Sequence, residues 1–322
     1  MIELSLNRRT LLTGAAVTAI AAPAVISGAT RARAEAPMLG AANPNFNRIK
    51  LGDFEVTTIL DAARAMDGPH PTFGENQEAG TVAELLEANN LPSEKMVNGF
   101  TPVLVNTGSQ LILFDTGLGG DAGTLASQLA AAGYTPEQVD IVVLTHMHPD
   151  HIGGLMSGGT PTYPNARYVA GQAEYDFWSA EERMSGPTER VATLVRSNVT
   201  PLAEKTTFIG DGGEVVSGIT GIDTSGHTPG HMSFHVESGG KRLLIWGDVA
   251  NHFVASIQRP DWHVRFDMDK EKAAATRKRI FDMVATDGVP VTGYHMPFPA
   301  LGYIQATGES YRWNPAAYQF AL

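Results

Sequence analysis

Residues 141–154 read IVVLTHMHPDHIGG, and this stretch decides the fold. Its first four residues are all apolar, which is typical of a strand buried on both faces. Four side chains that can bind a metal, those of His146, His148, Asp150 and His151, follow at the strand end. In an extended loop His146 and His148 point to one side, and Asp150 and His151 lie across a turn where they can face a second ion. The pattern predicts a metal site rather than a histidine-rich surface loop.

The composition narrows the chemistry of such a site. The chain has 322 residues, of which 43% are hydrophobic and 18% are charged, and no cysteine. That is enough apolar material for a large core. Without cysteine, any metal site must use His, Asp or Glu, and no disulfide can stabilise the fold. The glycines at 153 and 154 are expected to let the backbone bend tightly around the ligands.

The first 34 residues are interpreted as an export signal. Arg8 and Arg9 form a twin-arginine pair ahead of an apolar stretch, and Ala32-Arg33-Ala34 places small residues at the two positions that a signal peptidase reads. We expect cleavage near Ala34 and a periplasmic protein. The alternative is an uncleaved membrane anchor. Residues 35–322 then form one domain, which begins with an irregular arm over 35–47.

Cleavage would leave a strongly acidic chain. Removing four arginines and one glutamate from 23 basic and 34 acidic side chains leaves 19 and 33, a formal net charge of −14. Such a protein repels phosphate backbones, which argues against nucleic acid as a partner. No later stretch is long and apolar enough to span a bilayer, so stable membrane insertion after cleavage is not expected.

Hydrophobic patterning indicates two β-rich halves with helices outside them. In the first half we expect strands over 54–60, 103–106, 111–114 and 141–144, and helices over 81–88, 124–132, 173–178 and 189–197. In the second half we expect strands over 207–209, 219–223, 232–236, 243–246, 289–292 and 302–305, and a helix over 270–285. Thr81 is the expected cap of the first helix and Asp269 that of the last.

Further motifs occur in an order that resembles the metallo-β-lactamase superfamily. The matching elements are the His-x-His-x-Asp-His pattern, an Asp-Thr-Gly turn, a second histidine motif, a Gly-Asp strand end and a final histidine: residues 146–151, 115–117, 226–231, 247–248 and His295. The resemblance covers roughly residues 50–305. It implies an α/β fold, the four-layer αββα sandwich, with the site at one edge of the paired sheets.

The resemblance also implies two divalent metal ions held by two sets of side chains. One ion would be held by His146, His148 and His227. The other would be held by Asp150, His151 and His295. Zn²⁺ suits imidazole and carboxylate donors best, and Mn, Co and Fe are alternatives.

Two aspartates have separate expected roles. Asp248 would bridge the ions together with a hydroxide, and it is the expected catalytic residue because it can take up a proton. Asp115 would lie behind the ligands and accept a hydrogen bond from a ligand histidine or from nearby backbone.

The remaining histidines are weighed separately. The four-residue spacing of His227, His231 and His235 resembles a helical zinc motif, but the intervening Pro-Gly pair prevents a helix, so only His227 is interpreted as a ligand. His231 is interpreted as structural and His235 as packed or exposed. His252 and His263 lie in an aromatic-rich loop, where contact with substrate is the alternative to a structural role.

Within the superfamily, the chain is most similar to methyl parathion hydrolase and its lactonase relatives. The stretches that carry this similarity are 105–109, 132–140, 146–156, 176–178 and 311–313. In that subgroup aromatic side chains line the leaving-group pocket, and Trp178 falls on one such position, with core packing as the alternative. Phe253, Trp262 and His252 are further pocket candidates. The helix around Val191 lacks the expected aromatic, which favours a lactone or aryl ester over a phosphotriester.

The resemblance therefore implies a hydrolase in which a bridging hydroxide attacks a small neutral ester-like substrate. Lactones, aryl esters and phosphotriesters are the candidates, that is, a lactonase with organophosphate hydrolase activity. Two other activities stay open: a β-lactam hydrolase, and a mono-iron dioxygenase of the same fold. The oligomeric state is also open, with a homodimer as one candidate.

Overall fold

The computed structural model describes residues 44–316 and 321–322, and two seven-stranded sheets carry most of its core. In spatial order, the first sheet contains β1 (Phe46–Leu51), β2 (Phe54–Ile59), β5 (Val103–Asn106), β6 (Leu111–Phe114), β7 (Ile141–Val143), β10 (Arg167–Gly171) and β11 (Thr206–Ile209). The second contains β12 (Glu214–Val216), β13 (Ile219–Asp223), β14 (Met232–Ser238), β15 (Lys241–Ile245), β16 (Val291–Thr292), β17 (Leu301–Thr307) and β18 (Ser310–Pro315). Both sheets are mixed, because β6, β7, β10 and β11 run parallel and so do β15 and β16.

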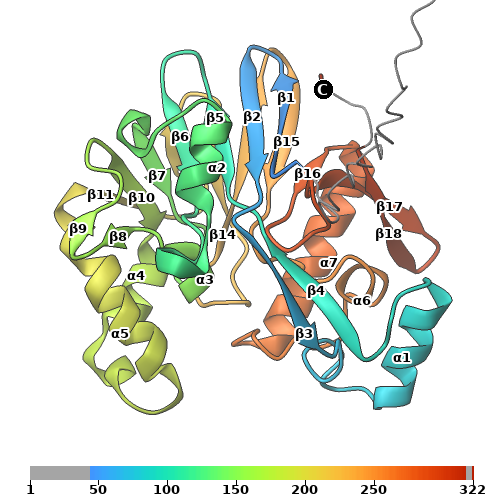
Figure 1. The fold of residues 1–322 in the computed structure, drawn as a ribbon. Coiled ribbons are helices and arrows are strands. Elements are labelled where there is room, and N and C mark those ends of the chain that lie inside the picture. Colours follow the sequence, from blue (N-terminus) through green and yellow to red (C-terminus); the bar gives the residue numbers. More distant parts are fainter. Residues whose placement is uncertain (1–43, 317–320) are drawn as a thin grey trace, which may run out of the picture. The chain divides into compact units, whose positions relative to one another are not determined.

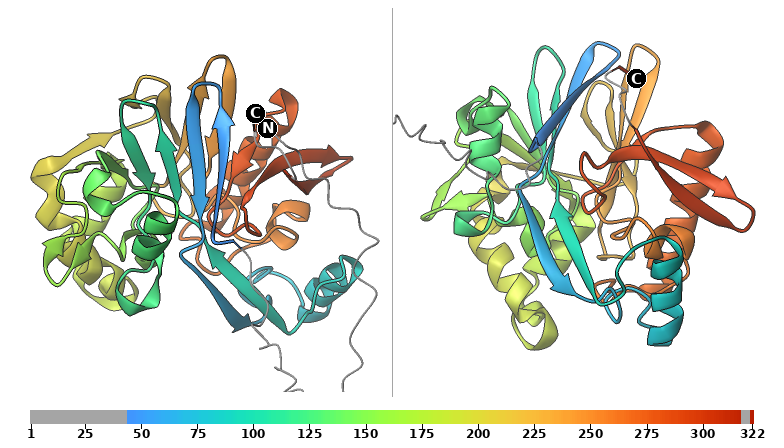
Figure 2. Two further views of the ribbon diagram at one scale, coloured as in Figure 1. Left: turned by 45° about the horizontal axis from the view of Figure 1, so that its top comes forward. Right: turned by 45° about the vertical axis from the view of Figure 1, so that its right-hand side comes forward.

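Helices flank the two sheets on their outer faces (Figures 1 and 2). The first sheet is covered by α2 (Leu125–Ala131), α4 (Gln172–Ser179) and α5 (Glu189–Asn198), and the second by α7 (Lys270–Asp287). Three further helices lie at loops, namely α1 (Ala79–Ala88), α3 (Pro149–Ile152) and α6 (Ala255–Gln258). Among the described residues, none of these helices is long and apolar enough to cross a membrane.

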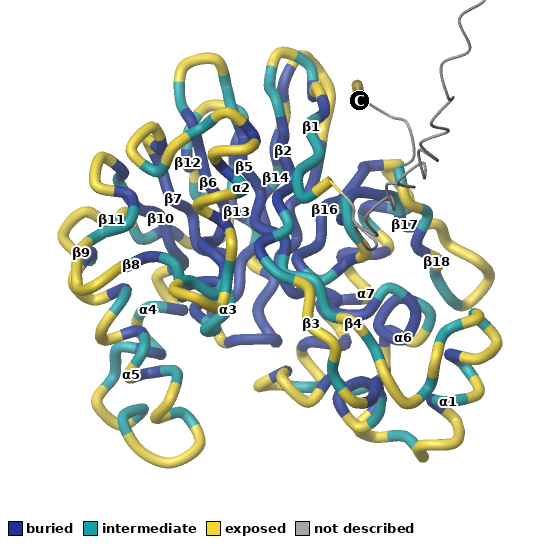
Figure 3. Tube along the Cα trace, viewed as in Figure 1, coloured by how far each residue is buried: buried dark blue, intermediate teal, exposed yellow. Residues whose placement is uncertain are grey.

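Strand alternation explains why the layers form. Along β6, Leu111 and Leu113 pack on the helix side of the sheet, while Ile112 and Phe114 point into the layer between the sheets. Successive side chains of a strand face opposite ways, so a continuous apolar run serves both layers. The rings of Phe114 and Phe234 meet across this layer at 5.3 Å between centroids. Figure 3 shows the central strands buried and the connecting loops exposed. The expected four-layer αββα sandwich is confirmed.

Most of the expected helices and strands are present. The strands expected over 103–106 and 111–114 occur with those bounds. Helix α7 begins at Lys270, as expected, since the side chain of Asp269 accepts a hydrogen bond from Lys272 N at 3.0 Å. The helix ends at Gly288, whose left-handed φ of 63° suits glycine.

Two expectations about local structure are wrong, and one hairpin is unpredicted. The arm expected over 35–47 contains the start of β1 at Phe46, because Ile49 and Leu51 bury their side chains. Thr81 does not cap α1, which begins two residues earlier after Glu78. The hairpin of β3 (Ala62–Asp67) and β4 (Lys95–Phe100) was not expected. The interpretation of residues 1–34 as a signal lies outside the described residues.

The hairpin of β3 and β4 matters because it contributes to the site. In Figure 1 it extends below the sheets, toward the bottom of the view, where α5 also lies but farther to the left. Residues from both elements line one cavity, described below. A second short hairpin, β8 (Met156–Ser157) with β9 (Thr160–Pro161), follows the histidine motif.

Candidate active site

The histidine motif occupies the loop after β7 and the single turn of α3. His146 and His151 are fully buried, with 0% of their surface exposed. The turn of α3 begins directly after His148, because Pro149 suits the first position of a helix. Asp150 and His151 lie within this turn, whereas His146 and His148 precede it.

The glycines after α3 are needed for close packing of the backbone, and not for the tight bend that was expected. Neither Gly153 nor Gly154 adopts a left-handed conformation. Instead, a Cβ on Gly154 would lie 2.1 Å from Thr116 O, and one on Gly153 would lie 2.2 Å from Leu118 O. Glycine is therefore required here because the loop that follows Asp115 passes directly against the motif.

His146, His148 and His227 form the first group of candidate ligands. Each offers a ring nitrogen, and these atoms all lie within 4.8 Å of one another. His227 comes from the loop between β13 and β14, and its Nε2 lies 3.0 Å from Nδ1 of His148. The structure thus brings together residues 79 positions apart in the chain.

Asp150, His151 and His295 form the second group, with ligand atoms also within 4.8 Å of one another. Oδ2 of Asp150 lies 3.5 Å from Nε2 of His151 and 3.4 Å from Nε2 of His295. His295 comes from the loop between β16 and β17, on the other sheet. Both sheets therefore contribute to each group.

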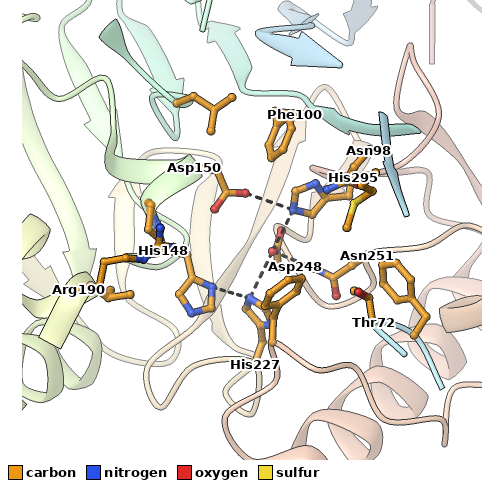
Figure 4. Close-up of a pocket in the computed structure, with 16 residues that line it drawn as sticks. Thr72, Asn98, Phe100, His148, Asp150, Arg190, His227, Asp248, Asn251 and His295 are labelled. Atoms are coloured by element: carbon orange, nitrogen blue, oxygen red, sulfur yellow. Dashed lines mark hydrogen bonds and ion pairs between the residues drawn. The ribbon is translucent and has the colours of Figure 1, made fainter. Parts of the chain in front are cut away.

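Asp248 lies between the two groups, directly after β15 (Figure 4). Its Oδ2 is 3.3 Å from Nε2 of His227 and 3.3 Å from Nε2 of His295. Its Oδ1 is 3.4 Å from Nε2 of His151. One carboxylate thus reaches both groups, which is the place expected of a shared ligand.

Asp115 fixes the orientation of the His151 ring. Oδ2 of Asp115 lies 2.8 Å from Nδ1 of His151 and accepts a hydrogen bond from Thr145 Oγ1 at 2.8 Å, while Oδ1 accepts one from Thr145 N at 2.8 Å. Asp115 has a φ of 61°, which aspartate tolerates better than most residues. Both partners expected of Asp115, a ligand histidine and nearby backbone, are present.

A buried ion pair that was not predicted from the sequence fixes the His227 ring. Nδ1 of His227 lies 2.8 Å from Oδ1 of Asp267, whose Oδ2 accepts a hydrogen bond from Arg277 at 2.8 Å. Arg277 is only 1% exposed. The available signal was its place on the apolar face of α7, four residues after Ala273 and three before Ile280, where an arginine needs a buried partner.

The donor set fits metal ions. Nε2 of His146, Nε2 of His151 and Oδ1 of Asp248 are buried and have no hydrogen-bond partner among the described residues. Buried polar atoms are normally satisfied, so this cluster of unpartnered atoms calls for a ligand. Imidazole nitrogens and carboxylate oxygens without cysteine suit zinc and other borderline divalent ions.

The electrostatics of the cluster favour a positive charge at its centre. Burial and neighbouring histidines lower the pKa of His148 to about 3, so its ring is neutral and free to bind a metal. Burial also opposes the charged form of His227 and His295. The carboxylates around them, above all Asp248, outweigh burial and raise these two pKa values to about 9 and about 10. A divalent cation would satisfy the same carboxylates.

The other histidines have structural places. His231 is buried, and its Nε2 accepts a hydrogen bond from Asp248 N at 3.0 Å, so it positions the shared aspartate. Nδ1 of His252 accepts hydrogen bonds from the backbone of Val254 and Ala255 at the start of α6. His235 is half-buried on β14.

A cavity of about 410 Å³ opens beside the ligand groups. Its polar lining comes from Asp150, Asp248 and the three histidines at 148, 227 and 295, together with Thr72, Asn98, Arg190 and Asn251 (Figure 4). Its apolar lining consists of Met66, Phe73, Phe100, Leu118, Pro149, Val191 and Phe266. The cavity is thus polar at the centre and mainly apolar around it.

The four aromatic or histidine residues expected to line this pocket are not among its lining residues, although the Trp178 ring lies 6.2 Å from the ring of His148, which is. Trp178 is 2% exposed, belongs to the core beneath α4, and donates its indole N–H to Oε1 of Glu174 at 2.8 Å. Phe253 and Trp262 pack in the apolar cluster around α1 and α6. His252 caps α6. The apolar lining comes instead from the hairpin and from loops that no sequence motif marks.

Two asparagines in the lining were also missed. Nδ2 of Asn251 donates to Oδ2 of Asp248 at 2.9 Å, and Oδ1 of Asn251 is buried without a partner among the described residues. Oδ1 of Asn98, on β4, is unpartnered in the same sense. The position of Asn251, three residues after Asp248, was the only sequence signal.

Comparisons with known proteins agree with this site. Residues 101–287 match the model of the metallo-beta-lactamase superfamily. AidC, a dizinc quorum-quenching lactonase, has a TM-score of 0.77 at 25% identity, over 85% of this chain and 98% of AidC. The hydrolase AbOPH in the beta lactamase superfamily has a TM-score of 0.78 at 29% identity, over 86% of this chain and 99% of AbOPH. In sequence, the N-acyl homoserine lactonase AttM of Agrobacterium fabrum is 30% identical over 135 residues, 38% of this chain and 46% of AttM, so the chain spans about half of that relative.

Proposed function

Because this chain belongs to the metallo-beta-lactamase superfamily, we propose that it is a binuclear metal-dependent hydrolase of the lactonase type. One observation carries the proposal. Asp248 lies 3.3 Å from nitrogens of His227 and His295, so a single carboxylate joins two groups of candidate ligands beside an apolar cavity. The similarity to a dizinc lactonase supports the same reading.

His146, His148 and His227 would hold one ion, and Asp150, His151 and His295 the other. Asp248 would contact both, and Zn²⁺ is the favoured metal. When bound, two such ions lower the pKa of a coordinated water and polarise the oxygens of the group under attack.

The chain's own residues supply position and proton transfer. Asn251 donates to Oδ2 of Asp248, which holds the carboxylate between the ligand groups. The Asp248 carboxylate, which lies between the two ligand groups, would take up the proton of the attacking water. His231 holds the Asp248 backbone from behind, because its Nε2 accepts a hydrogen bond from Asp248 N.

The cavity favours a neutral substrate with an apolar portion. Seven apolar side chains line it, and contacts of this kind are worth about 1–3 kcal/mol for each well-packed group. Arg190 is the one lysine or arginine among the lining residues, and the whole chain carries a formal net charge of −11. Polyanionic substrates would therefore approach against the field of the protein.

Asn251 favours a lactone that carries an amide N–H. The carboxylate of Asp248 can only accept, so the hydrogen bond from Nδ2 fixes the orientation of the Asn251 amide. Its Oδ1 is buried and has no partner among the described residues, and because Asn251 lines the cavity we assign this oxygen as the acceptor for a substrate donor. An N-acyl lactone, the kind of substrate named for AttM, offers a matching donor next to its ester.

A substrate panel tests the reaction class. We expect N-acyl lactones to be hydrolysed fastest, ahead of simple lactones, aryl esters, phosphotriesters and β-lactams. A panel in which a β-lactam or a phosphotriester is the best substrate, and lactones are inert, would contradict the lactonase proposal. Phosphotriester hydrolysis, as a slower activity of the same site, stays a prediction from the sequence.

The variant Asn251→Leu tests the substrate class more narrowly. It should lower kcat/KM for an N-acyl lactone by about 10-fold to 100-fold more than for an unsubstituted lactone of equal length, because only the former loses a hydrogen bond. Any loss that comes through Asp248 affects both substrates equally. The ratio of the two kcat/KM losses therefore reports only on the hydrogen bond from the amide N–H of the substrate. An equal loss for both would remove Asn251 from substrate recognition.

We also propose that the chain is exported by a twin-arginine signal, on the evidence of Arg8, Arg9 and the small residues before Ala34. The double variant Arg8→Lys, Arg9→Lys should leave the protein in the cytoplasm as a precursor. The matched control is Arg31→Lys, Arg33→Lys, which should export normally. Immunoblots of cell fractions distinguish the cases, and mature periplasmic protein from the first variant would refute the proposal.

A further inference from the structure

Glu174 is a buried carboxylate that neither ligand group uses. It lies in the first turn of α4 and is only 1% exposed. The loop after His227 passes directly over it, since a Cβ on Gly230 would lie 2.1 Å from Glu174 N. Burial raises the pKa of this carboxyl, because the charged form loses its hydration. A charge in such a place needs partners.

Four donors surround the carboxylate and occupy both of its oxygens. Oε1 accepts hydrogen bonds from Met147 N at 2.9 Å and from Trp178 Nε1 at 2.8 Å. Oε2 accepts from Thr228 Oγ1 at 2.7 Å and from Gly230 N at 2.9 Å. These are charge-assisted hydrogen bonds, which are stronger than those between neutral groups.

Three of the four donors belong to the two loops that carry one ligand group, and the fourth, Trp178, lies on α4 with Glu174 itself. Met147 stands between His146 and His148, and Thr228 directly follows His227. These three histidines are the first group of candidate ligands. A single side chain therefore joins the backbone on both sides of that group.

The second ligand group is held by other contacts. Nδ1 of His295 donates to Gly99 O at 2.8 Å, and Tyr294 donates its hydroxyl to Asp150 O at 2.5 Å. Glu174 has no hydrogen bond to these segments among the described residues. Its influence should be confined to one of the two metal positions.

We propose that Glu174 is a positioning residue that sets the spacing of His146, His148 and His227 and so controls the affinity of that metal position alone. The inference rests on the proposed binuclear function. Glutamine tests it with little change of volume, because a glutamine has one carbonyl oxygen and an NH₂ group. Two of the four donors would then face a donor instead of an acceptor.

Calorimetric titration of the metal-stripped protein with Zn²⁺ provides the measurement. For the wild type we expect two binding events. In Glu174→Gln one event should weaken by about 10-fold to 100-fold, as for other partners behind metal ligands, while the second keeps its affinity. The matched control is Asp176→Asn on the exposed side of the same helix, which should change neither event.

Two results would overturn the proposal: both affinities unchanged in Glu174→Gln, or both reduced equally, as a general loss of packing would cause. If Glu174→Gln does not fold, Trp178→Phe removes a single donor, and it should weaken the same event selectively but less. If Trp178→Phe leaves both Zn²⁺ affinities unchanged, or lowers both equally, the proposal is overturned as well. If the wild type binds only one ion, the binuclear function is wrong. The Glu174 proposal then stands only if Glu174→Gln weakens the binding of that one ion.

Discussion

Asp248→Ala is expected to lower kcat/KM for lactone hydrolysis by at least about 10³-fold, the largest loss for any single substitution considered. The variant should also retain fewer than two metal ions after dialysis. The physical reason is the central place of this carboxylate, whose oxygens lie 3.3 Å from His227 and His295 and 3.4 Å from His151. Removing it takes a negative charge from both metal positions at once.

The matched control for this variant is Asp261→Ala, which removes an exposed aspartate from a nearby loop. It should keep full metal content and turnover. Elemental analysis and steady-state kinetics give both readouts. If Asp248→Ala keeps two ions and near-normal turnover, Asp248 is not the shared ligand.

Asp267→Ala is expected to have the largest effect on stability, a loss of about 3–5 kcal/mol in the free energy of unfolding. Arg277 is 1% exposed, and the substitution would leave its guanidinium buried without the carboxylate that lies 2.8 Å away. His227 would lose the partner of its Nδ1 as well. Metal affinity should therefore fall by about 10-fold to 100-fold.

Denaturant unfolding of the metal-free protein measures the free energy of unfolding without the contribution of bound metal. The control is Arg242→Ala, which breaks the exposed pair of Arg242 and Asp287 and should cost less than about 1 kcal/mol. The double variant Asp267→Ala, Arg277→Met should recover part of the loss, because it no longer buries an unpaired charge. A single variant as stable as the control would show that the buried pair contributes nothing.

Local sequence patterns predicted the parts of the fold that depend on local physics. The continuous apolar run at 141–144 predicted β7, and the turn after residue 106 predicted β5 and β6. Each prediction needed only residues that are neighbours in the sequence. The hairpin of β3 and β4 was not predicted, because 27 residues separate Asp67 from Lys95 and the two strands contain few buried residues. Its pairing is a tertiary event that no short-range pattern carries.

The site divides in the same way. His146, His148, Asp150 and His151 are recognisable because their spacing in one loop is itself the signal. Arg277, Glu174 and Asn251 are not, since each acts on a ligand segment through contacts formed only in the folded chain. The wrong pocket assignment of Trp178 has a related cause: helix periodicity places it on a face, but only the packing of α4 shows that this face is the core.

Titration of the metal-stripped protein with Zn²⁺, followed by the rate of N-acyl lactone ring opening, tests the central claim most directly. The binuclear lactonase account predicts that hydrolysis rises with added metal and reaches its plateau at two equivalents per chain. A plateau at one equivalent, or full metal loading without lactone hydrolysis, would contradict it.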